Sequence, residues 1–197
     1  FELRKKGISE NDVATICYTS GTTADPKGIM LTHKNYVVNV EQACELFPIP
    51  PKYVTLLILP WDHAFAHTAG IFTFLKNGGC IASVDAGNSP LDSLKNIPVN
   101  IRETKPHILL SVPALSQNFK KNIENAIRSK GKMTETLFAV GLKISYLYFG
   151  DGNYKNRGWR FILYPLVRLF DSIIFSKIRE GFGGRLKYFV GGGALLD

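Results

Sequence analysis

Residues Tyr18 to His33 combine glycine and hydroxyl-bearing residues with a lysine, which are the residue types that bind phosphate groups. At Gly21 and Gly28 no Cβ keeps an anion away from the backbone N–H groups. Lys27 adds a positive charge, and further donors come from four hydroxyl groups, those of Thr19, Ser20, Thr22 and Thr23. Each hydrogen bond to a charged group is worth about 1.5–3 kcal/mol. The stretch is therefore predicted to hold a triphosphate.

A surface loop and a P-loop are the two other interpretations of this stretch. A short cluster of glycine, serine and threonine is usually a surface loop, but here the pattern continues without a break from Tyr18 to His33. A P-loop is excluded because that motif needs Gly-Lys followed by serine or threonine at the start of a helix. In this chain the order is Lys27-Gly28, and an apolar, strand-like run follows.

A second group of polar residues, ending in His63, follows the apolar run Val54 to Leu59. Open α/β sheets bind their ligands at the carboxyl ends of strands, so this is a favourable position for a functional side chain. A single histidine is nevertheless more often structural than catalytic. His67 lies one helical turn further on. It is expected to pack in the protein or to contact residues that themselves contact the ligand.

The elements around these residues alternate between strand and helix. Short apolar runs predict strands at 13–18, 28–31, 54–59, 80–84, 108–112 and 186–190. Helical spacing, with Thr32 as N-cap and Pro113 in a first turn, predicts helices at 33–47, 64–75, 91–104 and 113–127. This order predicts an α/β fold with a mostly parallel sheet and helices on both faces.

Between about 132 and 182 the pattern changes to two long helical segments, at 134–148 and 161–180, joined by a polar stretch. Pro165 is expected to begin the second helix or to kink it. Charged residues interrupt this helix too often for it to span a bilayer. An amphipathic helix that packs on the protein is favoured over one that touches a membrane surface.

The net charge and the cysteines of the chain limit the classes of binding partner and the cellular compartment that are expected. The net charge of +8 admits nucleic acid, anionic membrane or phosphorylated small molecules, but the basic residues lack the interleaved aromatics of a nucleic-acid module. Nucleic acid is therefore not expected. Cys17, Cys44 and Cys80 are far apart and odd in number, which favours a reducing cytosol and packing in the core. The oligomeric state is left open.

The stretch Thr19 to Gly28 resembles the phosphate-binding signature of the adenylate-forming superfamily, usually written Ser/Thr-Gly-Thr-Thr-Gly-x-Pro-Lys-Gly. Ala24 stands where that family has glycine, and a left-handed backbone there would cost about 1–2 kcal/mol. The end of the chain, Phe175 to Ala194, and the helical segment at 132–182 are similar to the long-chain acyl-CoA synthetase branch, although Leu195 replaces a usual proline.

The resemblance implies a two-step ligase that uses ATP, Mg²⁺ and CoA with a long-chain fatty acid. Thr19 would approach the magnesium ion, and the β- and γ-phosphates would lie against the loop, namely Ser20, Gly21, Thr22, Thr23, Ala24, Lys27 and Gly28. His63, in a Leu-Pro-x-x-His strand end, would orient or neutralise the carboxylate. Gly192, Gly193 and Ala194 would lie beside the adenine. The helix at 64–75 is the expected wall of an apolar acyl tunnel, since burial contributes about 0.8 kcal/mol per methylene.

Several family elements do not occur in this chain: the Tyr-Gly-x-Thr-Glu and Thr-Gly-Asp motifs, and the C-terminal lid domain with its lysine. The chain is thus expected to be part of the larger AMP-binding N-terminal domain, at 1–197, and to be inactive alone. Two alternatives stay open. One is a fatty acyl-AMP ligase that feeds a carrier protein, and the other is a non-catalytic nucleotide- or lipid-binding relative. A cytoplasmic protein, with membrane contact at most peripheral, is expected.

Overall fold

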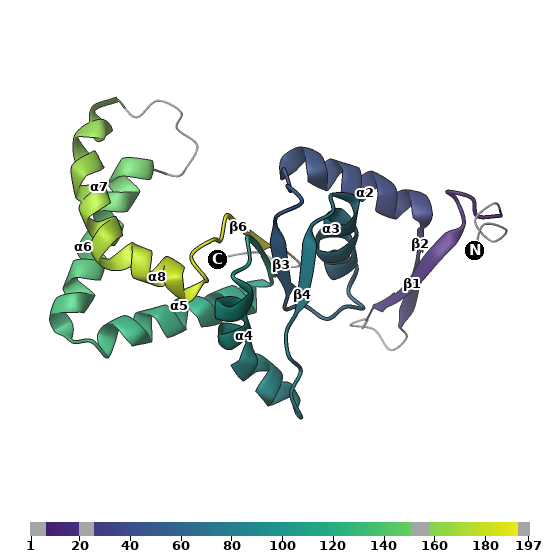
Figure 1. The fold of residues 1–197 in the computed structure, drawn as a ribbon, viewed down its shortest axis with the longest axis horizontal. Helices are drawn as coiled ribbons and strands as arrows, with labels where there is room; N and C mark the ends of the chain where they lie inside the picture. Colours follow the sequence, from purple (N-terminus) through teal and green to yellow (C-terminus); the bar gives the residue numbers. More distant parts are fainter. Residues whose placement is uncertain (1–6, 20–25, 151–157, 193–197) are drawn as a thin grey trace.

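The computed structural model describes residues 7–19, 26–150 and 158–192 and is built around a parallel sheet (Figure 1). The strands of this sheet run in the order β4-β3-β5-β6, all parallel to their neighbours. Their bounds are Val54–Leu57 for β3, Cys80–Ser83 for β4, Ile108–Ser111 for β5 and Tyr188–Gly191 for β6. The predicted α/β class is confirmed, although β3 ends two residues earlier than the apolar run suggested.

Helices cover both faces of the sheet, as predicted. On one face Ile108 and Leu110 of β5 pack with Phe74 from the helical stretch after β3. On the other face Leu56 and Leu109 pack against α4, Pro90–Thr104, and α5, Pro113–Arg128, also contributes. Alternate residues of a strand point to opposite faces, so the continuous apolar run of β5 fills two separate cores.

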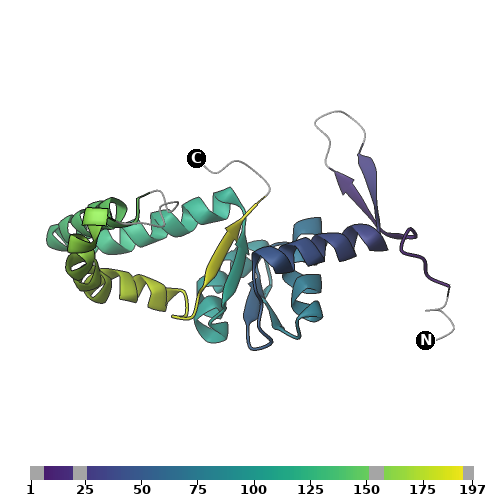
Figure 2. The ribbon, with the colours of Figure 1, turned by 90° about the horizontal axis from the view of Figure 1, so that it is seen from above.

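The predicted phosphate-binding stretch begins and ends in a separate antiparallel hairpin. Its strands are β1, Val13–Thr19, and β2, Lys27–Thr32. Helix α2, His33–Leu46, follows at once, and its N-cap Thr32 exchanges hydrogen bonds with Asn35 in a capping box. The two expected strands and the helix after them are confirmed, and the loop predicted between the strands, at 20–25, lies outside the described residues. Figure 2 shows the hairpin projecting at one end of the molecule.

The stretch after β3 is helical, as predicted, but it is not a regular α-helix. It contains the π-helical segment η1, Ala66–Phe72, followed by α3, Thr73–Lys76. The hydroxyl of Thr73 donates to the carbonyl of Thr68 at 2.5 Å, five residues earlier. A Cβ at Gly70 would lie only 2.3 Å from Leu57 Cδ2. The missing side chain therefore lets the wide π-helical turn pack directly on β3.

The helices predicted between 132 and 182 form an arm at the opposite end of the molecule from the hairpin (Figures 1 and 2). The first is α6, Lys132–Phe149. The second is a run of short helical segments: η2, Gly158–Leu163; α7, Tyr164–Phe170; η3, Asp171–Phe175; and α8, Ser176–Gly181. Pro165 lies in the first turn of α7, where its ring is tolerated. Whether the arm is an insertion relative to other family branches stays a prediction.

The three cysteines do not all pack in the core as expected. Cys17 and Cys44 are half-buried, but Cys80 is exposed at the start of the edge strand β4. The sequence pattern missed this because β4 has a neighbour on one side only. Within the described residues, no helix is both long and apolar enough to cross a membrane.

Candidate nucleotide and carboxylate site

Thr19 and Lys27 form the base of the predicted phosphate loop. The two residues are register partners at the end of the β1–β2 ladder, so they lie side by side where β1 ends and β2 begins. Lys27 is exposed, and no carboxylate among the described residues forms an ion pair with it. The loop residues predicted to bind phosphate, Ser20, Gly21, Thr22, Thr23 and Ala24, lie outside the described residues.

Gly28 is the one glycine of this stretch whose surroundings are described. A Cβ at this position would lie 3.1 Å from Ile16 Cγ2 and 3.3 Å from Tyr18 Cε1. Tyr18 is its register partner on β1, and the tyrosine ring fills the space over the glycine. In this structure Gly28 therefore serves the packing of Tyr18, and its predicted approach to a phosphate stays a prediction.

His63 lies beyond the carboxyl end of β3, where it starts the helix that runs to Lys76. Its Nδ1 accepts a hydrogen bond from the backbone N–H of Phe65 at 3.1 Å. This bond caps one of the free N–H groups of the first helical turn. Because Nδ1 is the acceptor, the proton of a neutral imidazole sits on Nε2, which is then a donor for a ligand. The ring is exposed.

Two cavities meet beside His63. The smaller one, of about 650 Å³, lies between the hairpin and the end of β3, and His63, Tyr18 and Asp62 line it. The larger one, of about 760 Å³, lies between α2 and the η1 helix. Leu31 and Ala64 line both cavities. A ligand could therefore place a charged end by His63 and extend past these two residues into the larger space.

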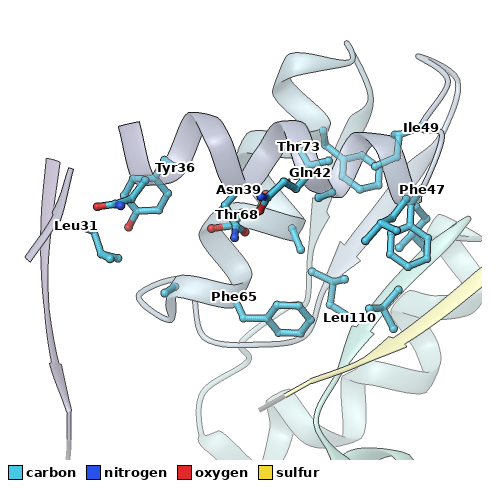
Figure 3. Close-up of a pocket in the computed structure, with 18 of the residues that line it drawn as sticks. Leu31, Tyr36, Asn39, Gln42, Phe47, Ile49, Phe65, Thr68, Thr73 and Leu110 are labelled. Carbon is cyan, nitrogen blue, oxygen red and sulfur yellow. The ribbon is translucent and has the colours of Figure 1, made fainter. Parts of the chain in front are cut away.

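The larger cavity is mainly apolar and runs from Leu31 to Phe47 and Ile49 (Figure 3). The helix predicted to be a tunnel wall does line it, through Ala64, Phe65, Thr68, Ala69, Thr73 and Phe74. Strands β5 and β6 contribute Ile108, Leu110 and Val190. Polar side chains are confined to the helical walls, where Asn39 and Gln42 of α2 face Thr68 and Thr73 (Figure 3).

The end of β6 reaches the same cavity wall. The backbone N–H of Gly192 donates to Ser111 O at 3.1 Å, which keeps the chain beside β5. A Cβ at Gly192 would lie 3.2 Å from Phe65 Cζ, so the glycine allows the chain to pass against this ring. The structure thus brings Gly192 and Phe65 together. Gly193 and Ala194 lie outside the described residues.

Sequence reasoning missed the contribution of α2. Tyr36 is buried, and its hydroxyl lies 3.3 Å from His67 Nδ1, which joins α2 to the η1 helix at the cavity wall. The rings of Tyr36 and His67 also contact Phe72. His67 accordingly packs behind the site, as expected. The helical spacing of Tyr36 and Val40 marked one face of α2 as buried, but no sequence signal showed which element it would face.

Magnesium was expected at Thr19, whose side chain is not among those described. Within the described part of the chain, no three His, Cys, Asp or Glu side chains come together as a metal site. Mg²⁺ commonly keeps several waters and is bound by one or two protein groups together with substrate phosphates. A magnesium site shared with substrate phosphates beside the hairpin end stays a prediction.

The fold and the cavities define an α/β protein whose candidate ligand site begins at the carboxyl end of β3 and extends over one face of a parallel sheet. Its sequence matches the family model for AMP-binding enzymes over residues 2–196, and the chain belongs to that family.

Two curated relatives match along the chain. Fatty acyl-CoA synthetase B of Dictyostelium discoideum is 28% identical over 207 residues, which cover 100% of this chain and 28% of the relative. Long chain acyl-CoA synthetase 8 of Arabidopsis thaliana is 31% identical over 200 residues, which cover 96% of this chain and 26% of the relative. The chain thus spans about a quarter of the length of these relatives.

Among solved structures, the fold is similar to that of a malonyl-CoA ligase crystallised with methylmalonyl-CoA and AMP. The TM-score is 0.50 at 21% identity, and the match covers 59% of this chain and 24% of that one. At this identity the likeness supports the fold alone.

Proposed function

We propose that this chain forms the phosphate- and acyl-binding side of an ATP-dependent fatty acid–CoA ligase. The observation that carries the proposal is the pair of cavities that share Leu31 and Ala64. One has His63 and the hairpin at its wall, and the other is apolar and long. A carboxylate by His63 and an aliphatic tail in the larger cavity would suit this arrangement. The match to long-chain acyl-CoA synthetases supports the same substrate class.

In the first step of the proposed reaction, a carboxylate oxygen of the fatty acid attacks the α-phosphorus of ATP. The bond from that phosphorus to the bridging oxygen breaks, and pyrophosphate leaves. Lys27 and the loop from Thr19 would hold the β- and γ-phosphates, and the Nε2–H of His63 would orient the carboxylate. Magnesium, when bound, neutralises phosphate charge. The contribution of the protein is therefore positioning and electrostatic stabilisation.

In the second step the thiol of CoA loses its proton and attacks the acyl carbonyl carbon. The acyl–oxygen bond to AMP breaks, which gives the thioester and AMP. The tail contributes binding free energy of about 0.8 kcal/mol for each methylene that the apolar cavity takes from water. Longer chains should bind more tightly until the cavity is full.

Fatty-acid-dependent exchange of pyrophosphate into ATP by the full-length protein tests the proposal. We expect exchange with long acyl chains and thioester formation when CoA is added. Lys27→Ala should lower kcat/KM for ATP by about tenfold or more, because a charged hydrogen bond to phosphate is lost. Lys120→Ala, an exposed lysine on α5, is the matched control and should leave it unchanged.

Each other outcome of this assay has a defined meaning. An absence of exchange with every fatty acid would refute the ligase proposal, and unchanged ATP binding in Lys27→Ala would favour a non-catalytic relative. Exchange without transfer to CoA would favour a carrier protein as the acyl acceptor. The 197-residue chain by itself is expected to show no exchange, and measurable exchange would contradict that expectation.

A further inference from the structure

The two helices of the arm form an antiparallel hairpin with one buried seam. Tyr148 contacts Tyr164 near the tip, and Phe138 contacts Phe175 nearer the sheet. Between these two pairs, a Cβ at Gly141 would lie 2.8 Å from Phe170 Cδ1. In these three pairs the residue number rises along α6 while it falls along the other helix. The two helices therefore run in opposite directions over the whole seam.

Each helix carries a second apolar stripe that is displaced by one residue from this seam. On α6 the seam follows Thr134, Phe138, Gly141, Ser145 and Tyr148, and the second stripe is Met133, Leu137, Val140, Ile144 and Leu147. On the other helix the seam follows Leu163, Val167, Phe170 and Ile174, and the second stripe is Ile162, Leu166, Leu169 and Ile173. Both stripes repeat at steps of four and three residues, which is one face of a helix.

The second stripes are open to solvent. On α6 four of the five residues are exposed, from 37% at Leu137 to 78% at Met133, and Ile144 is half-buried. On the other helix they run from 43% at Leu166 to 65% at Ile162. Unlike single exposed apolar residues, which are normal on a protein surface, this set is continuous along both helices.

The two stripes lie on the same side of the hairpin. A step of one residue turns a helical position by about 100°. Both stripes precede their seam by one residue, and the helices face each other while running in opposite directions. The two rotations therefore carry both stripes to the same side. We call the combined surface the arm face: Met133, Leu137, Val140, Ile144, Leu147, Ile162, Leu166, Leu169 and Ile173.

The charges around the arm face are mainly positive. The described part of 132–181 contains six basic and three acidic residues, which are Lys132, Lys143, Arg160, Arg168, Lys177 and Arg179 against Glu135, Asp171 and Glu180. Glu135 is paired with Arg128, and Asp171 is paired with Arg179. Lys143 and Lys177 are exposed and have no ion-pair partner among the described residues. The arm is therefore suited to an anionic partner.

We propose that the arm face docks on the surface of an anionic lipid bilayer. Apolar side chains flanked by basic residues, with Trp159 and Phe161 exposed near the tip, are the features of a helix that lies in a membrane interface. Anionic headgroups attract the lysines, and the acyl boundary takes the apolar side chains. A second copy of the chain is disfavoured as the occupant because it would bring a second set of basic flanks into the contact. The proposal does not rest on ligase activity.

Vesicle flotation of the full-length protein tests the docking. We expect stronger binding to vesicles of phosphatidylcholine with phosphatidylserine than to phosphatidylcholine alone. The double variant Leu137→Ser/Leu166→Ser should weaken binding by about tenfold or more, since two apolar side chains no longer enter the interface. The double variant Lys143→Gln/Lys177→Gln should weaken binding to anionic vesicles by about fivefold for each charge.

Leu91→Ser/Leu94→Ser is the matched control, because these leucines are even more exposed than Leu137 and Leu166 but lie on α4, outside the arm. It should bind as the wild type does. The glutamine variants change only exposed side chains, so they remain informative even if the serine variants fold poorly. The proposal is overturned if the wild type does not float, or if none of the arm variants weakens flotation. It is equally overturned if the arm variants instead separate a dimer in sedimentation, because a second copy would then cover the face.

Discussion

The two ring nitrogens of His63 have different roles. Nδ1 caps the first turn of the helix that lines the larger cavity, and the Nε2–H of the neutral ring would donate a hydrogen bond to a carboxylate. The same side chain thus fixes the start of the cavity wall and faces the junction with the smaller cavity. For this reason a structural and a functional role, which were alternatives at the level of sequence, are compatible at this residue.

Two substitutions at His63 separate these roles. Asparagine is a strong N-cap, whereas alanine is not, so His63→Ala should lower the free energy of unfolding by about 1 kcal/mol relative to His63→Asn. Both variants lose the imidazole, and both should reduce fatty-acid-dependent pyrophosphate exchange. Denaturant unfolding and the exchange assay measure the two effects. Equal stability of the two variants would argue against the cap, and full activity of His63→Asn would argue against the proposed role of Nε2.

The η1 helix packs closely on the sheet at Gly70. It lies on β3 and β5 without a side chain at Gly70, and its other side lines the larger cavity. A shift of this helix would therefore change the cavity. π-Helical turns are frequent at functional sites, and here the turn sets how closely the cavity wall approaches the strands.

Gly70→Ala should destabilise the protein by about 1–3 kcal/mol. The added methyl group would overlap Leu57, which is only 2% exposed and has little room to move. Gly181→Ala is the control, because nothing lies within 4 Å of a Cβ at that helical position. Its effect should be neutral or slightly stabilising. Urea unfolding of the two variants measures the difference, and equal stabilities would show that the sheet adapts to the larger residue.

Across the whole molecule, the cavity beside His63 lies at the carboxyl ends of the parallel strands, and a histidine that supports the sheet lies at the opposite, amino-terminal edge. At this opposite edge the Nδ1 of His107 accepts from Val54 N, and its backbone carbonyl accepts from Lys187 N and Tyr188 N. Its ring stacks on Tyr53 with centroids 4.5 Å apart. One buried histidine thereby connects β3, β5 and β6.

Burial lowers the pKa of His107, and the nearby charges of Arg185, Lys187 and Lys52 lower it further. The native state thus disfavours the protonated ring, which the unfolded chain accepts at an ordinary histidine pKa near 6.5. The contribution to stability is complete above that pH and is lost as the pH falls through the lower native pKa. His107→Gln should flatten this acid loss of the free energy of unfolding, as measured by urea titrations at several pH values. If the free energy of unfolding of His107→Gln falls with pH as steeply as that of the wild type, the acid loss belongs to other groups.

Much of the fold was predictable because its signals are local. The apolar runs of β3 and β5, the short strands β1 and β2 and the N-cap at Thr32 are each encoded by neighbouring residues, and the structure contains the expected order of elements. The η1 segment was predicted only as a helix. Its π-helical geometry depends on contacts of Gly70 with Leu57 and Leu110, which are distant in sequence.

The sequence by itself determined the alternating α/β order and pointed to Lys27 and His63, because residue type and spacing carry that information. The tertiary structure decided that Leu31 and Ala64 join two cavities and that α2 closes one of them. It also decided which apolar stripe of each arm helix is buried. Periodicity shows that a helix has an apolar face, but only the packing of distant segments decides which of two adjacent faces is covered.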